Sequence, residues 1–134
     1  MSELARIILS SDQEVRNRSL DSFCRAATAE TLLAECDDLE ALRRDSDNLY
    51  TRVRALFFLS SVHRMYLAGK PGVAPQGRVP FEGYTHLLHR RFEEAIRCFL
   101  EAQQHQGPNQ AVSSALATTY RSLAFQNLAD QVRR

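Results

Sequence analysis

Apolar residues recur at helical spacing along almost the whole chain. One stripe (Leu32, Leu33, Cys36, Leu39 and Leu42) has the i, i+3/i+4 spacing that places apolar side chains on one face of a helix. The same spacing recurs from end to end and predicts an all-α fold, an antiparallel helical bundle or short α-solenoid of about seven helices. The expected helices lie near residues 2–9, 11–27, 28–44, 48–67, 84–106, 109–123 and 125–132.

The segment 48–67 departs from this one-sided pattern. Around Leu56–Leu59 its apolar residues go almost all the way round, and such a helix is covered on several sides. We therefore expect it at the centre, with the other helices packed against it. Its three cations are Arg52, Arg54 and Arg64.

Charge divides the chain into two unequal parts. Residues 1–48 carry 11 acids and 6 bases, whereas residues 49–134 carry 5 acids and 11 bases, for a net charge of +1. We expect the three arginines of segment 48–67 to pair with the acidic part; an anion-binding row is the alternative.

Helix-capping polar residues and a Gly/Pro-rich loop separate the expected helices. Ser11 with Glu14, Thr28, Asn48 and Asn109 are expected N-caps. Residues 68–83 hold four of the five glycines and three of the four prolines, so they form a loop. We interpret 1–134 as a single helical domain in which this loop joins sub-regions 1–67 and 84–134. The loop's own function is left open, with Lys70, Arg78, Phe81 and Tyr84 as its candidate residues.

The composition, 44% hydrophobic and 25% charged, predicts an ordinary soluble globular protein. No apolar run approaches the length of a bilayer span, and the N-terminus has acids and too short an apolar stretch for a signal peptide. We expect a cytoplasmic location. Cys24, Cys36 and Cys98 lack metal-ligand spacing and are expected as buried reduced thiols. The last helix reaches Arg133-Arg134 without a stop signal, which suggests that the chain is part of a longer protein.

No residue pattern points to catalysis. Asp37-Asp38 and Glu93-Glu94 are adjacent pairs, which diverge by about 100° on a helix. His86 and His89 could share a metal only with two further ligands, so we interpret them as surface residues. His63 is expected to be a satisfied core or boundary histidine. We expect no enzyme activity, no catalytic residue, no metal and no cofactor.

Residues 81–134 resemble tetratricopeptide-repeat hairpins. The stretch Phe92–Ala102 (FEEAIRCFLEA) is similar to the second helix of that repeat, and Gly107–Asn109 to its inter-repeat turn. The family's small or apolar positions are matched by Gly83, Leu116, Ala117, Tyr120 and, thirty-four residues after Ala95, by Ala129. Arg90 and Gln126 stand near the intra-repeat turns, where glycine is usual, so 84–106 is also compatible with one unbroken helix. Residues 11–60 faintly resemble HEAT repeats through Val15-Arg16 and Val53-Arg54.

The resemblance implies a non-catalytic helical module for protein–protein interaction or scaffolding. The first helix of each pair would line a concave groove exposing Tyr84, Ser114, Thr118 and Arg121, with Arg121 reading an acidic peptide or partner surface. The alternative is an accessory helical domain of a larger multidomain enzyme. We expect a protein or peptide partner rather than a membrane or nucleic acid, and self-association is left open.

Overall fold

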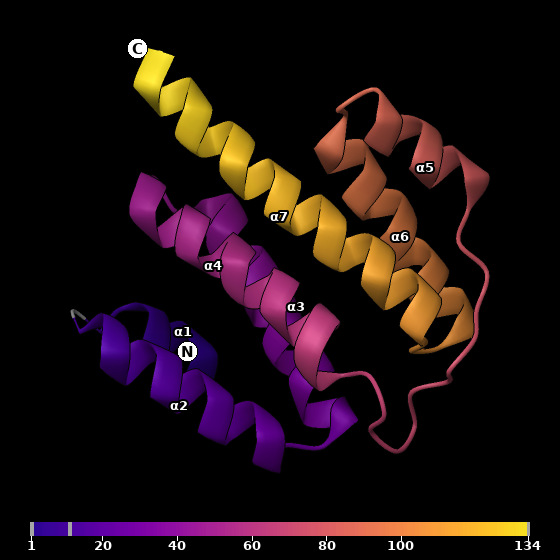
Figure 1. The fold of residues 1–134 in the computed structure, drawn as a ribbon, viewed down its shortest axis with the longest axis horizontal. Coiled ribbons are helices and arrows are strands. Elements are labelled where there is room, and N and C mark those ends of the chain that lie inside the picture. Colours follow the sequence, from indigo (N-terminus) through magenta and orange to yellow (C-terminus); the bar gives the residue numbers. More distant parts are fainter. Residues whose placement is uncertain (1, 11, 134) are drawn as a thin grey trace.

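The structure is a computed structural model that describes residues 2–10 and 12–133, with the side chain of Arg133 left aside. These residues form an all-α bundle of seven α-helices and one π-helix, which confirms the expected fold class (Figure 1). In chain order the elements are α1 (Glu3–Ile8), α2 (Gln13–Ala26), α3 (Ala29–Asp45), α4 (Leu49–Ser61), η1 (Val62–Tyr66), α5 (Phe81–Leu88), α6 (Phe92–Gln106) and α7 (Gln110–Arg133).

Side-chain caps fix where several helices begin. Thr28, Asn48 and Asn109 each accept a hydrogen bond from the backbone N–H three residues later, as predicted. Asp12 caps α2 by accepting from two backbone N–H groups of its first turn. Ser11, the cap expected there, lies outside the described residues. Satisfying these N–H groups matters because the first turn of a helix has no intrahelical acceptors for them.

The segment 48–67 is central, as predicted. Helix α4 packs against α3 and α1 on one side and α7 on the other, while α6 packs against α7 and α5 against α6 (Figure 1). Leu56 and Leu59 are buried between these neighbours. One hydrophobic cluster reaches from Leu4 in α1 to Ala124 in α7, so the two sub-regions share a core.

This segment is not one regular helix, however. Its α-helical part ends at Ser61, and η1 continues it as a π-helix in which Leu67 N–H donates to Val62 O over 3.0 Å. The wider turn buries His63 and Tyr66 together with Val62. Single π-turns are rare and frequently lie at functional positions.

The second sub-region has one helix break inside an expected helix and lacks one break that was expected. The number of α-helices in the described residues therefore stays as predicted. The segment 84–106 is interrupted, because Arg90 adopts a left-handed φ of 60° between α5 and α6. Arg91 N–H then donates to His86 O over 2.8 Å, which closes α5 as a Schellman-type turn. Conversely, α7 runs through Gln126 without the break expected before Phe125. No glycine or proline follows Pro108, so nothing in the sequence ends that helix.

The Gly/Pro-rich loop is an ordered strap across one end of the bundle. Ala74 donates to Pro108 O over 2.9 Å and accepts from Gln110 N–H over 2.8 Å. Gly77 lies so close to Asn109 that a Cβ would stand 2.1 Å from the Asn109 Oδ1 atom. The strap therefore fixes the position from which α5 departs.

Candidate functional site

Three of the four predicted partner-binding residues lie together on the outer face of α7. Ser114, Thr118 and Arg121 follow i, i+4, i+7 spacing and are all exposed. Arg64 of η1 joins them, because its Nη2 donates to Thr118 Oγ1 over 3.2 Å. The Arg121 guanidinium lies 5.6 Å from the centroid of the Phe125 ring, which extends the same helix face by one more turn.

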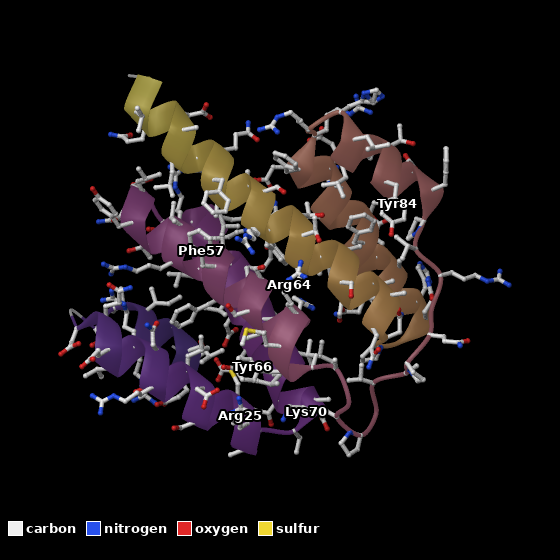
Figure 2. The ribbon with its side chains drawn as sticks, viewed as in Figure 1. Arg25, Phe57, Arg64, Tyr66, Lys70 and Tyr84 are labelled. Atoms are coloured by element: carbon white, nitrogen blue, oxygen red, sulfur yellow. The ribbon has the colours of Figure 1, made fainter. Side chains whose placement is uncertain are left out.

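Aromatic side chains continue this surface onto α4. Phe125 meets Phe57 edge to face, with ring centroids 5.5 Å apart, and 50% of Phe125 remains exposed. We call this surface the α7 strip: Phe57, Arg64, Ser114, Thr118, Arg121 and Phe125. Figure 2 shows Phe57 and Arg64 along the line where α4 meets α7. The sequence prediction missed Phe125 because it ended the helix at residue 123, whereas the unbroken α7 places Phe125 one turn after Arg121 on the same face.

Tyr84 is not brought into the α7 strip. It lies on α5, and its ring packs edge to face against Phe99 of α6 at 6.0 Å. Helix α6 packs against both α5 and α7, so the two helices expected to line one groove are separated by a third. Figure 2 places Tyr84 across α7 from Arg64.

The expected ion pairs between segment 48–67 and the acidic part are wrong. Arg54 donates to the backbone oxygen of Ile8 over 3.3 Å, and Arg64 to Thr118. Among the described residues, Arg52, Arg54 and Arg64 form no ion pair with a carboxylate of residues 1–48. Glu40, the carboxylate of α3 that does form ion pairs, is occupied by Arg43 and Arg44 of α3 itself.

The ion pairs that do join the two sub-regions centre on Arg43 of α3. Its side chain is only 4% exposed, and its two Nη atoms each donate to Glu93 of α6 over 2.9 Å. Its Nε donates to Glu40 over 2.6 Å, and Arg44 donates to the same carboxylate. Tyr120 of α7 adds a hydroxyl donor to Glu40 over 3.1 Å. This buried network links α3, α6 and α7.

The network holds its members in their ordinary charge states. Burial opposes ionisation of Glu40, but hydrogen bonds from Arg43 and Arg44 outweigh burial and lower the pKa of the carboxyl group. Burial likewise opposes the charge of Arg43, and the hydrogen bonds to Glu93 and Glu40 outweigh it and raise the guanidinium pKa. Burial and the charge of Glu40 raise the pKa of Tyr120. These interactions keep Glu40 and Arg43 charged in the folded protein, so that their ion pair stabilises the fold.

His63 is a core histidine that is only half satisfied. Its Nδ1 lies 3.3 Å from Ser113 Oγ, and its ring stacks on Tyr120 with centroids 6.0 Å apart. Its Nε2 is buried without a hydrogen-bond partner in the described part of the chain. Burial lowers the pKa of His63 to about 4, so the ring is neutral at physiological pH.

The other residues considered as metal ligands do not lie together around one position. The Nδ1 atom of His86 accepts from Arg91 Nε over 2.9 Å, which removes its lone pair from a shared site with the exposed His89. Cys24 and Cys36 are buried, as expected, and Cys98 is half-buried. Across residues 2–10 and 12–133, no group of three His, Cys, Asp or Glu residues is placed to hold a metal ion.

Comparison with protein-family models, with curated proteins and with solved structures gave no match for this chain. In the part of the chain that the structure describes, none of the helices combines the length and the hydropathy that a membrane span requires.

Proposed function

We propose that this protein is a non-catalytic helical interaction module that binds a segment of a partner protein along the α7 strip. The segment is acidic and has side chains that can pack against aromatic rings. The observation that carries the proposal is the stacking of Arg121 on the half-exposed Phe125, which itself packs on Phe57. Aromatic residues and arginine are the side chains enriched in the energetic centres of protein interfaces.

Charge favours an acidic partner. Segment 48–67 contains no acid, and Asp130 is the one acid after Glu101. Within the described residues, neither Arg64 nor Arg121 has a carboxylate partner. Two unpaired guanidinium groups beside exposed aromatic rings suit a segment in which carboxylates alternate with apolar side chains.

The scaffold under the strip supports the same proposal. Helices α5 and α6 form an antiparallel hairpin closed at Arg90, and Gly83 lets them approach so closely that a Cβ would stand 2.3 Å from the Phe99 ring. A small residue at a close helix crossing is what the tetratricopeptide-like reading of residues 81–134 requires. A rigid hairpin packed against α7 would hold the α7 strip in position. This supporting role needs no catalytic group.

Selection from a random-peptide display library tests the proposal directly. We expect the selected peptides to be enriched in Asp and Glu flanking an apolar residue, and their affinity to fall as salt is raised. Arg121→Glu should reverse the selected charge and leave the circular-dichroism spectrum unchanged. The matched control is Arg18→Glu, an exposed arginine on α2, which should select the same peptides as the wild type.

Two results would overturn the proposal. One is a selection with no charge preference. The other is an acidic preference that Arg18→Glu and Arg121→Glu change equally, because binding would then depend on net charge and not on the α7 strip.

A further inference from the structure

A second feature lies away from the α7 strip, where the C-terminal end of α3, the start of α4, the start of α6 and the C-terminal half of α7 converge (Figure 1). These elements enclose a cleft of about 360 Å³. Its walls are mostly polar and include three arginines, with Leu56 as an apolar floor; the lining residues are Arg43, Arg44, Arg52, Leu56, Glu93 and Asn127.

The carboxylates at this cleft already accept hydrogen bonds from the protein's own side chains. Glu40, beneath the cleft, accepts from Arg43 Nε, Arg43 Nη2, Arg44 Nε and the Tyr120 hydroxyl, which fills the four lone-pair positions of a carboxylate. Both oxygens of Glu93 accept from Arg43. The carboxylates of the network are thus committed to Arg43 and its immediate neighbour.

Some guanidinium N–H donors at the cleft, by contrast, have no acceptor in the part of the protein that the structure describes. None of the ion pairs in the described residues includes Arg52, and its buried Nε has no hydrogen-bond partner there. Arg44 uses its Nε on Glu40, while its Nη2 stands 3.7 Å from Glu93, outside hydrogen-bonding distance. Asn127 also lines the cleft and contributes a side-chain amide.

From this imbalance we infer that the cleft binds a small oxyanion, a carboxylate or phosphate group, on the guanidinium of Arg52 with help from Arg44 and Asn127. A guanidinium presents planar N–H donors that match such a group in a two-point contact. The volume suits a small metabolite rather than a peptide. A second hollow of about 210 Å³ adjoins the cleft and shares Arg52 and Asn127 with it, so the remainder of the ligand would extend along α7 past Asp130.

The first test uses inorganic phosphate and succinate as separate probes on the whole chain, at constant ionic strength set with chloride. We expect at least one probe to raise the unfolding temperature and to shift the amide NMR signals of Leu56 and Asn127 in a saturable way. Binding of phosphate alone identifies a phosphate group as the ligand chemistry, and binding of succinate alone identifies a carboxylate. No saturable response to either probe at concentrations of tens of millimolar overturns the inference.

Matched variants locate the site. Arg52→Gln should weaken binding about tenfold or more, since a charge-assisted hydrogen bond to the anion is lost. Asn127→Asp, nearly isosteric, should also weaken it by placing a negative charge in the wall that Asn127 shares with Arg52. The control Arg64→Gln, on the α7 strip, should bind the probe like the wild type.

Equal affinities for Arg52→Gln and the wild type, with both folded by circular dichroism, would contradict the assignment. This inference does not depend on the proposed partner binding. Arg121→Glu should leave probe affinity unchanged, and Arg52→Gln should leave the peptide preference of the α7 strip unchanged, so either proposal can fail alone.

Discussion

Arginines lie on two sides of helix α7, and the two sets have opposite environments: Arg43 of α3 lies on its inner side, and Arg121 of α7 itself lies on its outer side. On its inner side, Arg43 is 4% exposed and every hydrogen bond it makes ends on a carboxylate of the same network. On its outer side, Arg121 is exposed and meets only an aromatic ring within the described residues. The residue type is the same, but burial decides whether the guanidinium holds the fold together or faces solvent.

The energetic difference between the two sets follows from solvent. Removing one member of a buried ion pair leaves a charge that water cannot reach, which costs several kcal/mol. Removing an exposed charge costs less than about 1 kcal/mol because water already screens it. Stability measurements can therefore separate the inner set from the outer one.

The largest expected effect is that of Arg43→Met. Glu93 loses its main partner and Glu40 loses two donors, so the free energy of unfolding should fall by about 3 kcal/mol. Urea unfolding followed by circular dichroism measures this loss. Arg44→Met is the control, because Arg44 is 45% exposed and should cost about 1 kcal/mol or less. Equal losses for the two variants would remove the distinction drawn between buried and exposed arginines.

His63 should make stability depend on pH in a defined window. Its pKa is about 4 in the folded state and near 6.5 when exposed, so between these values the unfolded chain binds more protons. The free energy of unfolding should be unaffected by this group above pH 6.5 and fall by up to about 3 kcal/mol as pH drops towards 4.

Comparison with His63→Phe isolates this contribution, because the carboxylates titrate in both proteins and their effects cancel in the difference. The difference in unfolding free energy between the two should change through this window and be constant above it. A constant difference from pH 7 to pH 4 would show that the ring is hydrated in the folded protein.

An intermediate effect is expected at the contact between η1 and α2. Tyr66 is largely buried, and its hydroxyl donates to Asp21 over 2.8 Å, while Arg25 pairs with the same carboxylate. Burial and this hydrogen bond raise the pKa of Tyr66 to about 12. Tyr66→Phe should lower the free energy of unfolding by about 1 kcal/mol. Spectrophotometric titration of the wild type should then show one tyrosine ionising near pH 12, and the variant should lack it.

The smallest effect is expected on the outer side of α7. Arg121→Glu should change the free energy of unfolding by no more than about 0.5 kcal/mol, since the side chain is exposed and has no carboxylate partner there. Chemical denaturation at pH 7 measures it. A loss as large as that of Arg43→Met would mean that the α7 strip is part of the fold and not a free surface.

Local chemistry made much of this fold predictable. Stripes such as that of Leu32, Cys36 and Leu39 are local signals, and so are the caps Thr28 and Asn48. The all-round apolar character of α4 indicated its central place before any neighbour was known. These features depend on residues a few positions apart, which sequence periodicity records directly.

The features that were missed depend on contacts distant in sequence or on backbone geometry. The turn at Arg90 lies where the repeat resemblance has its intra-repeat turn, but the choice between this turn and one unbroken helix stayed open because arginine seldom adopts a left-handed conformation. The π-turn of η1 has no residue signature. The pairing of Arg43 with Glu93 joins positions far apart in the chain, so charge counting assigned the contact to the wrong arginines. The repeat resemblance placed Ser114, Thr118 and Arg121 on one surface with Tyr84, and the separation of Tyr84 required knowing that α6 packs against both α5 and α7.

The contact of the strap with the start of α7 has a consequence for how this protein can vary. Because Ala74 is hydrogen-bonded to both Pro108 and Gln110, the chain leaves for the α5–α6 hairpin and returns from it at the same place. Along the backbone, residues 75–107 therefore leave and rejoin the rest of the chain at one junction, while α6 packs against α7 and pairs with Arg43 through Glu93. A change of length in the hairpin should therefore leave α4 and α7 in place only where the replacement still covers the apolar side of α7 and still offers a carboxylate to Arg43. The junction at Ala74 is the position at which such a change would disturb the backbone of the other helices least.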